Sequence, residues 1–293
     1  MRRGIDAGML TRVLTAVVLA PAVAALVWFS PPEIVAAGAA VVALVALREF
    51  FLLGERVGLR AFQKWTMFSA AALFFAQYAE GLRETHRFGL GFFLVREARF
   101  SDVSIEAVLL LFLLGAAAIG LGTRRPLPEV LPAVSISSAG LLFIALPFSY
   151  VVRINELERI GRELLLFTLC LVWAGDTLAY LVGRSLGRML MAPVLSPKKT
   201  WEGAFANLLG SLLVAVLFAR WLEVDVHVLL VVAGLGNVAG QMGDLMESAY
   251  KRGAAVKDSG ALLPGHGGML DRVDALIFAA PVVWFTYQWL LAR

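Results

Sequence analysis

The chain has 293 residues, of which 60% are hydrophobic and only 16% are charged, with a formal net charge of +4. Its mean hydropathy of +0.80 excludes an ordinary soluble domain, in which charged residues make up about 25%. The basic balance does not require a nucleic-acid partner, because membrane proteins carry extra Lys and Arg in their cytoplasmic loops. A single cysteine, Cys170, excludes an internal disulfide.

The apolar runs predict an all-α, polytopic integral membrane protein with about nine transmembrane helices. In chain order the runs are 12–29, 34–53, 65–80, 105–122, 133–152, 164–183, 203–222, 226–246 and 272–291. The first run resembles a signal peptide, but the many spans after it favour a retained helix. The third run is the weakest, because it is short and is interrupted by Gln77.

We find no soluble domain in the sequence, so residues 1–293 are expected to form one membrane domain. Within it, we expect residues 1–160 to supply scaffold helices that face lipid or a dimer partner. Residues 164–291 are expected to supply the catalytic helices and loops.

The distribution of Lys and Arg predicts the sidedness of the loops. If the N-terminus is cytoplasmic, 17 of the 26 basic residues fall on the cytoplasmic side, as the positive-inside rule favours. The 81–104 loop is the exception, since it has four arginines on the opposite side and is expected to lie along the interface. We therefore expect a multi-pass protein of the inner (cytoplasmic) membrane, with the 184–202 and 247–271 loops in the cytoplasm.

Residues 244–274 form a polar, glycine-rich island between two apolar runs, and five of them are acids. Ionisable groups beside a bilayer are costly and usually mark function. Helical spacing places Asp244, Glu247, Ser248 and Lys251 on one face, and Asp271 and Asp274 open the last run. Such oxygen ligands suit Mg²⁺, either as one ion or as a pair. The alternative is an interfacial cluster in which Lys and Arg side chains neutralise these acids.

Between the two acidic segments lies a loop with phosphate-binding character. Lys257 and Asp258 precede it, and Gly267 and Gly268 allow backbone N–H groups to face an anion near the start of the last helix. His266, between glycines, is a candidate proton carrier, a phosphate donor, or a residue that only fixes the loop by hydrogen bonding.

A second polar cluster precedes this island. Asp176 lies in the middle of the sixth run and should face a partner or a polar cavity, not lipid. Lys198 and Lys199 follow a proline turn, where they either meet phosphates or only anchor the chain at the cytoplasmic surface. Glycines along the eighth run, Gly236, Gly240 and Gly243, allow close helix packing or leave clearance for a substrate.

The run from Ser248 to Asp274, SAYKR-x4-KDSG-x2-LP-x-HGG-x2-DR-x-D, resembles the signature of the phosphatidate cytidylyltransferase family. The segments GDTLAYLVGR (175–184) and SPKKTWEG (196–203) resemble the same family. One departure is Tyr250, where the family usually has an aliphatic residue or Phe. The resemblance implies a membrane enzyme that joins CTP to phosphatidic acid, releasing pyrophosphate and CDP-diacylglycerol. It also implies Mg²⁺, alone or with K⁺, a homodimer, and a metal-binding pair formed by Asp244 and Asp271.

These arguments assign roles to three sets of residues. The predicted catalytic residues are Asp244, Asp271, Lys257, Asp258 and His266. The predicted substrate- and phosphate-binding residues are Lys198, Lys199, Ser248, Lys251, Arg252, Gly267, Gly268 and Arg272. The predicted metal ligands are Asp244, Asp271, Asp274, Asp176 and Glu247. The expected partners are CTP, phosphatidic acid, membrane lipids and a second copy of the chain, with no nucleic acid.

Two other functions fit parts of the same pattern. Another CTP- or polyprenyl-phosphate-dependent lipid phosphotransferase would share the acids, the Mg²⁺ and the basic loops. An ion-coupled transporter would use Asp176 and Asp244 to guide ions, although the charges cluster at one face of the membrane and do not follow a path across it.

Overall fold

The computed structural model describes residues 7–85, 103–260 and 267–291, with side chains described from residue 18 and, in the first range, to residue 82. Most of the 81–104 loop and His266, for which we expected an interfacial position and a chemical role, lie outside the described residues.

The described residues are almost entirely helical, which confirms the predicted fold class. The helices are α1 (Ala7–Phe29), α2 (Pro32–Arg56), α3 (Gln63–Thr85), α5 (Ile105–Gly122), α6 (Leu127–Gly140), α7 (Leu146–Asn155), α8 (Gly161–Leu186), α9 (Trp201–Leu222), α10 (Val226–Gly253) and α11 (Leu270–Leu291). A π-helical turn, Leu141–Ala145, joins α6 to α7, so residues 127–155 form one continuous helical segment. Each of the nine predicted runs lies within one such segment.

Seven of the described helical segments are long and apolar enough to cross a membrane. The other two predicted runs lie in α1, whose described apolar part is only Val18–Phe29, and in α3, which contains Gln77. The amide Nε2 of Gln77 donates to Ser149 Oγ on α7 at 2.9 Å. This bond provides an acceptor for the NH₂ group of a side chain that is fully buried, and so helps α3 to pack in the bundle despite its weaker hydropathy.

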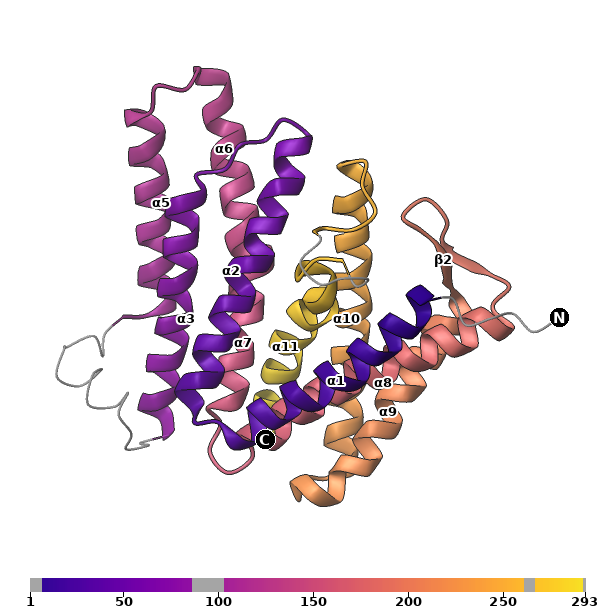
Figure 1. The fold of residues 1–293 in the computed structure, drawn as a ribbon. Helices are drawn as coiled ribbons and strands as arrows, with labels where there is room; N and C mark the ends of the chain where they lie inside the picture. Colours follow the sequence, from indigo (N-terminus) through magenta and orange to yellow (C-terminus); the bar gives the residue numbers. More distant parts are fainter. Residues whose placement is uncertain (1–6, 86–102, 261–266, 292–293) are drawn as a thin grey trace.

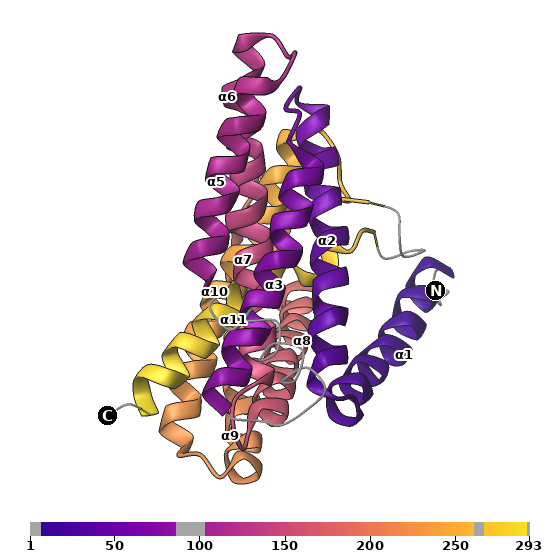
Figure 2. The same ribbon diagram turned by 90° about the vertical axis from the view of Figure 1, so that its left-hand side faces the viewer.

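The helices form an elongated bundle with two ends (Figure 1). In that view the α5–α6 turn and the end of α10 lie toward the top, as does the hairpin of β1 (Leu190–Ala192) and β2 (Ser196–Thr200). The α7–α8 and α9–α10 turns lie at the bottom. Figure 2 shows that α1 lies apart from the upright helices. It packs mainly against α8, and Trp28 near its end contacts Trp221 of α9, with ring centroids 5.5 Å apart. The alternation of ends agrees with the alternation that the charge distribution predicted.

Small residues bring α10 and α11 together. A Cβ added at Gly240 would lie 3.4 Å from the Ala275 carbonyl oxygen, and one at Gly243 would overlap the Asp274 carbonyl oxygen. The neighbours of these glycines are protein atoms, so close packing accounts for them, as the first of the two readings expected.

Helix α10 extends further than the eighth apolar run predicted. The expected loop began at residue 247, but the helix continues to Gly253. The prediction was wrong at this boundary. The apolar run ends where the charged residues begin, but the backbone hydrogen bonds of the helix continue through those residues. The charged residues from Glu247 to Arg252 are therefore held on a rigid element.

Candidate active site

The C-terminal turns of α10 and the start of α11 meet through Lys251. Its ammonium forms ion pairs with Glu247 on its own helix and with Asp271 Oδ1 at 2.6 Å. Glu247 and Asp271 are almost fully buried, with 3% and 7% of their side chains exposed. Two buried acids thus share one base. Part of the acidic cluster is therefore neutralised by Lys251 in this structure, as the alternative interpretation of the sequence expected.

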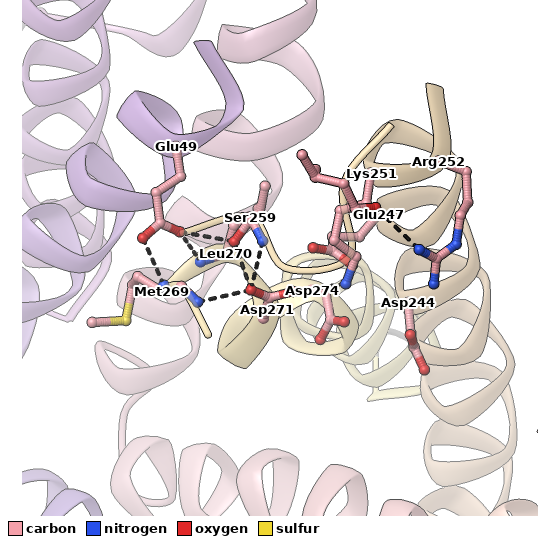
Figure 3. Close-up of polar contacts among 12 residues, drawn as sticks. Glu49, Asp244, Glu247, Lys251, Arg252, Ser259, Met269, Leu270, Asp271 and Asp274 are labelled. Atoms are coloured by element: carbon pink, nitrogen blue, oxygen red, sulfur yellow. Dashed lines mark hydrogen bonds and ion pairs between the residues drawn. The ribbon is translucent and has the colours of Figure 1, made fainter. Parts of the chain in front are cut away.

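The second oxygen of Asp271 organises the glycine-rich loop (Figure 3). Asp271 Oδ2 accepts hydrogen bonds from Ser259 N at 2.9 Å, Ser259 Oγ at 2.8 Å and Gly268 N at 2.8 Å. Gly267, directly before, has a φ of 78°, and a Cβ there would lie 2.7 Å from Asp271 Oδ2. Glycine is therefore required at this position both by backbone conformation and by space.

A short hairpin brings the second motif to the same place. Strands β1 (Leu190–Ala192) and β2 (Ser196–Thr200) pair antiparallel, and the Thr200 side chain caps α9 by accepting from Gly203 N at 3.2 Å. The cap fixes where β2 ends, and Lys199 there forms an ion pair with Asp244 on α10.

Arg252 ties the hairpin to the end of α10. Its Nε donates to the Leu195 carbonyl at 3.1 Å and its Nη1 to the Val256 carbonyl at 3.0 Å. Arg252, which the sequence predicted to bind phosphate, is exposed, and in this structure it donates to backbone carbonyls. Together with the Lys199–Asp244 pair, it shows that the two motifs, about fifty residues apart, form one site.

Acids from three helices surround this junction. Asp274 on α11 lies within electrostatic reach of Asp244, Glu247 and Asp176, and Figure 3 shows it between Asp271 and Asp244. Glu247 and Asp274 also line a small cavity, together with apolar residues that include Tyr250 and Phe278. The site therefore combines two acids whose side chains are buried, Glu247 and Asp271, with partly buried Asp244 and Asp274 and with exposed Asp176.

The sequence interpretation missed a chain of amides that ends at Asp176. Gln241 Nε2 donates to Asn237 Oδ1 at 2.7 Å, Asn237 Nδ2 donates to Asn207 Oδ1, and Asn207 Nδ2 donates to Asp176 Oδ1 at 3.1 Å. A carboxylate only accepts hydrogen bonds, so it sets the direction of the whole chain. The amides join α8, α9 and α10, and Gly175 leaves the space that the Asn207 side chain fills.

The remaining predicted site residues are either exposed to solvent or buried. Lys198, Lys257, Asp258 and Arg272 are exposed at this end of the bundle, whereas Ser248 and Gly268 are buried. Arg272 lies within electrostatic reach of Asp176. The exposed bases are placed to meet an anion that arrives from water.

The oxygen donors suit a hard divalent cation, but most are engaged with protein donors. Within the described ranges, no group of three or more His, Cys, Asp or Glu side chains is arranged to hold a metal. Asp244 is paired with Lys199 and Asp271 Oδ1 with Lys251. The residues fit Mg²⁺ by their chemistry, and an ion bound there would compete with these lysines for the carboxylates.

A sequence model of the cytidylyltransferase family matches residues 10–290. The chain belongs to this family. The match covers nearly the whole chain, including both motifs and the helices that precede them. It confirms the resemblance that the two motifs indicated.

Individual relatives match about half of the chain. The phosphatidate cytidylyltransferase of Bacillus subtilis (strain 168) is 38% identical over 154 residues, which are 52% of this chain and 57% of that protein. Those of Staphylococcus aureus (strain COL) and Staphylococcus epidermidis (strain ATCC 12228 / FDA PCI 1200) are each 40% identical, over 153 and 143 residues. These alignments cover 52% and 48% of the chain, and 57% and 54% of the two proteins. The chain thus spans little more than half the length of these relatives.

Proposed function

We propose that this chain transfers the cytidylyl group of CTP to phosphatidic acid, giving CDP-diacylglycerol and pyrophosphate. The observation that carries the proposal is the junction of the two motifs, in which Lys199 pairs with Asp244 and Arg252 bonds the Leu195 carbonyl. It supports the proposal because it unites acids for a metal with bases for phosphates at one end of a membrane bundle. The family match and the names of the relatives support the specific reaction.

In the proposed reaction, a phosphate oxygen of phosphatidic acid attacks the α-phosphorus of CTP in line, and pyrophosphate leaves. The attacking group is already an anion, so no nucleophilic side chain is needed, and the protein contributes positioning and charge neutralisation. Lys198, Lys199, Lys251, Arg252 and Lys257 would bind the phosphates, with Arg272 in support. Gly267 and Gly268 would shape the loop beside them, since the Gly268 N–H donates to Asp271. Acyl chains would remain in the bilayer beside the bundle.

We further propose that Asp244 and Asp271 bind Mg²⁺, with Asp274, Asp176 and Glu247 as supporting ligands. When bound, the ion would neutralise charge on the phosphates of the nucleotide. A second divalent ion or K⁺ is part of the same proposal, because the family resemblance implies it. Lys199 and Lys251 would then move from carboxylate to phosphate partners.

The finer placement in the cell belongs to the same proposal. The chain is a multi-pass membrane protein, and we propose that it lies in the inner membrane as a homodimer, with the hairpin and the end of α10 in the cytoplasm. CTP is a cytoplasmic nucleotide, so this orientation gives it direct access to the exposed bases.

The test uses the purified full-length chain in liposomes with phosphatidic acid, Mg²⁺ and CTP labelled in its cytidine. We expect lipid-extractable label and pyrophosphate in equal amounts, and loss of both with a chelator. CDP together with a phosphorylated lipid would instead indicate a kinase. Ion flux without consumption of CTP would indicate a transporter. The absence of lipid-linked cytidine under every metal tested would reject the proposed reaction.

A further inference from the structure

The structure assigns a positioning role to Glu49 of α2, a residue far from both motifs in the sequence. We propose that Glu49 holds the two ends of the glycine-rich loop together and thereby sets the position of Asp271. The inference about catalysis rests on the proposed function, whereas the inference about the loop does not.

Glu49 accepts three hydrogen bonds from the loop and the start of α11 (Figure 3). Its Oε1 accepts from Met269 N at 3.0 Å, and its Oε2 accepts from Leu270 N at 2.8 Å and from Ser259 Oγ at 3.0 Å. The first N–H groups of a helix have no partner within the helix, and a negative charge is favourable there. These donors offset the cost of burying the Glu49 carboxylate, which is 6% exposed, in an apolar bundle.

Ser259 connects Glu49 to Asp271. Its hydroxyl oxygen lies 3.0 Å from Glu49 Oε2 and 2.8 Å from Asp271 Oδ2, so its single proton is shared between the two carboxylates. The same Asp271 oxygen accepts from Ser259 N and Gly268 N. Two carboxylates, one from α2 and one from α11, therefore tie residue 259 to residues 268–270.

The space around Glu49 explains two glycines. A Cβ added at Gly268 would overlap the Glu49 carboxylate and Ser259 Oγ, and one at Gly260 would lie 2.5 Å from Glu49 Oε1. The sequence favoured phosphate binding as the reason for Gly268. The structure shows that the glycine first provides room for a side chain from another helix.

Helix α2 also packs against α10, the helix that carries Lys251. Phe50, next to Glu49, packs edge-on against Tyr250 of α10, with ring centroids 5.3 Å apart. This contact fixes α2 relative to α10, while Glu49 fixes α11 and the loop relative to α2. Asp271 is thereby placed against Lys251 of α10 by a connection that runs through the N-terminal part of the chain.

The experiment compares Glu49→Gln with Glu55→Gln by hydrogen–deuterium exchange of the detergent-purified full chain. Glu55 lies on the same helix but is exposed and bonded to Gln63, so it is a matched control. Glutamine keeps the size of Glu49 but offers one acceptor oxygen in place of two. We expect the amides of residues 259 and 268–271 to exchange about tenfold faster in Glu49→Gln, with no change in Glu55→Gln. Unchanged exchange at these amides would overturn the proposal.

Activity provides the second readout. In Glu49→Gln we expect kcat to fall about tenfold while the KM for CTP stays within about twofold, because the exposed bases are untouched. A fall in kcat without faster exchange would contradict the role in the loop. Faster exchange in a protein whose wild type makes no lipid-linked cytidine would reject the proposed function and leave the loop role standing.

Ser259→Ala covers the case in which Glu49→Gln does not fold. It removes only the shared hydroxyl, and we expect faster exchange at residues 268–270 together with a lower kcat. If Ser259→Ala matches wild type in both measurements, the connection from Glu49 to Asp271 is absent and the proposal fails.

Discussion

Asp244 and Lys199 are the two side chains through which the motifs of this protein meet. Both are partly exposed, at 32% and 28%, so the ion pair adds little to stability. The ion pair instead holds the Lys199 ammonium beside Asp244. In the proposed mechanism, Lys199 then exchanges this carboxylate for a phosphate of the substrate.

We predict that Asp244→Asn lowers the rate of CDP-diacylglycerol formation at least about a hundredfold, since the charge that would hold the metal is lost. The thermal midpoint should change little. The control is Asp225→Asn, at the start of α10, where Asp225 accepts from His227 N at 2.7 Å and Asn caps a helix equally well. A rate within about twofold of wild type for Asp244→Asn would count against the metal assignment.

The amide chain supports a second prediction. Asn207→Leu removes the donor to Asp176 and leaves Asn237 with only Ser211 as acceptor. We expect a loss of about 1 kcal/mol in the free energy of unfolding in detergent and a slower reaction, because Asp176 is no longer oriented. Thr177→Val is the control, since the Thr177 hydroxyl donates to the Trp173 carbonyl of its own helix and is outside the amide chain. Equal activity in Asn207→Leu and wild type would show that the chain is structural only.

At the scale of helices, the acids of the site lie where α10 and α11 pack against each other. Helices α10 and α11 approach closely where their acids lie, because Gly243 faces the backbone of Asp274. The close approach places Asp244 and Asp274 on adjacent turns of two helices, which neither helix achieves alone.

We predict that Gly243→Ala destabilises the protein while Gly234→Ala does not. A Cβ at Gly243 would press on the Asp274 carbonyl and on Phe278, at 3.0 Å, whereas nothing lies within 4 Å of one at Gly234. Overpacking costs about 1–3 kcal/mol, and alanine in an open helical position gains up to about 1 kcal/mol. Thermal unfolding in detergent measures both. Equal midpoints would show that α10 and α11 do not pack as closely as described.

For the whole molecule, the two ends of the bundle predict opposite accessibility. In a Cys170→Ser background, Val194→Cys in the hairpin and Glu223→Cys after α9 place one thiol at each end. With the proposed orientation, a membrane-impermeant thiol reagent added to intact cells should label only the cysteine at 223. Labelling of only the cysteine at 194 would reverse the orientation, and labelling of both would contradict a bundle that spans the membrane.

Hydropathy alone predicted the helices because a bilayer requires each span to be apolar and to satisfy its own backbone hydrogen bonds. All nine runs lie within observed helices, and the only boundary error of consequence, at α10, arose where charge begins inside a continuing helix. The two motifs also pointed to most of the acids and bases that the fold brings together at one end of the bundle, because charged side chains next to apolar runs stand out in the sequence.

The hydrogen-bond partners of the site depend on how the helices pack against one another. Glu49 lies 210 residues from Ser259 and 221 from Leu270, and no periodicity connects residues at such separations. Asn207 and Asn237 read as ordinary polar positions within helices until α8, α9 and α10 are packed together. Composition and order along the chain are enough to identify the residues apolar enough to span the membrane and those that carry charge at its edge. The packing decided which carboxylate meets which donor, because a hydrogen bond depends on positions in space that helices distant in sequence reach only together.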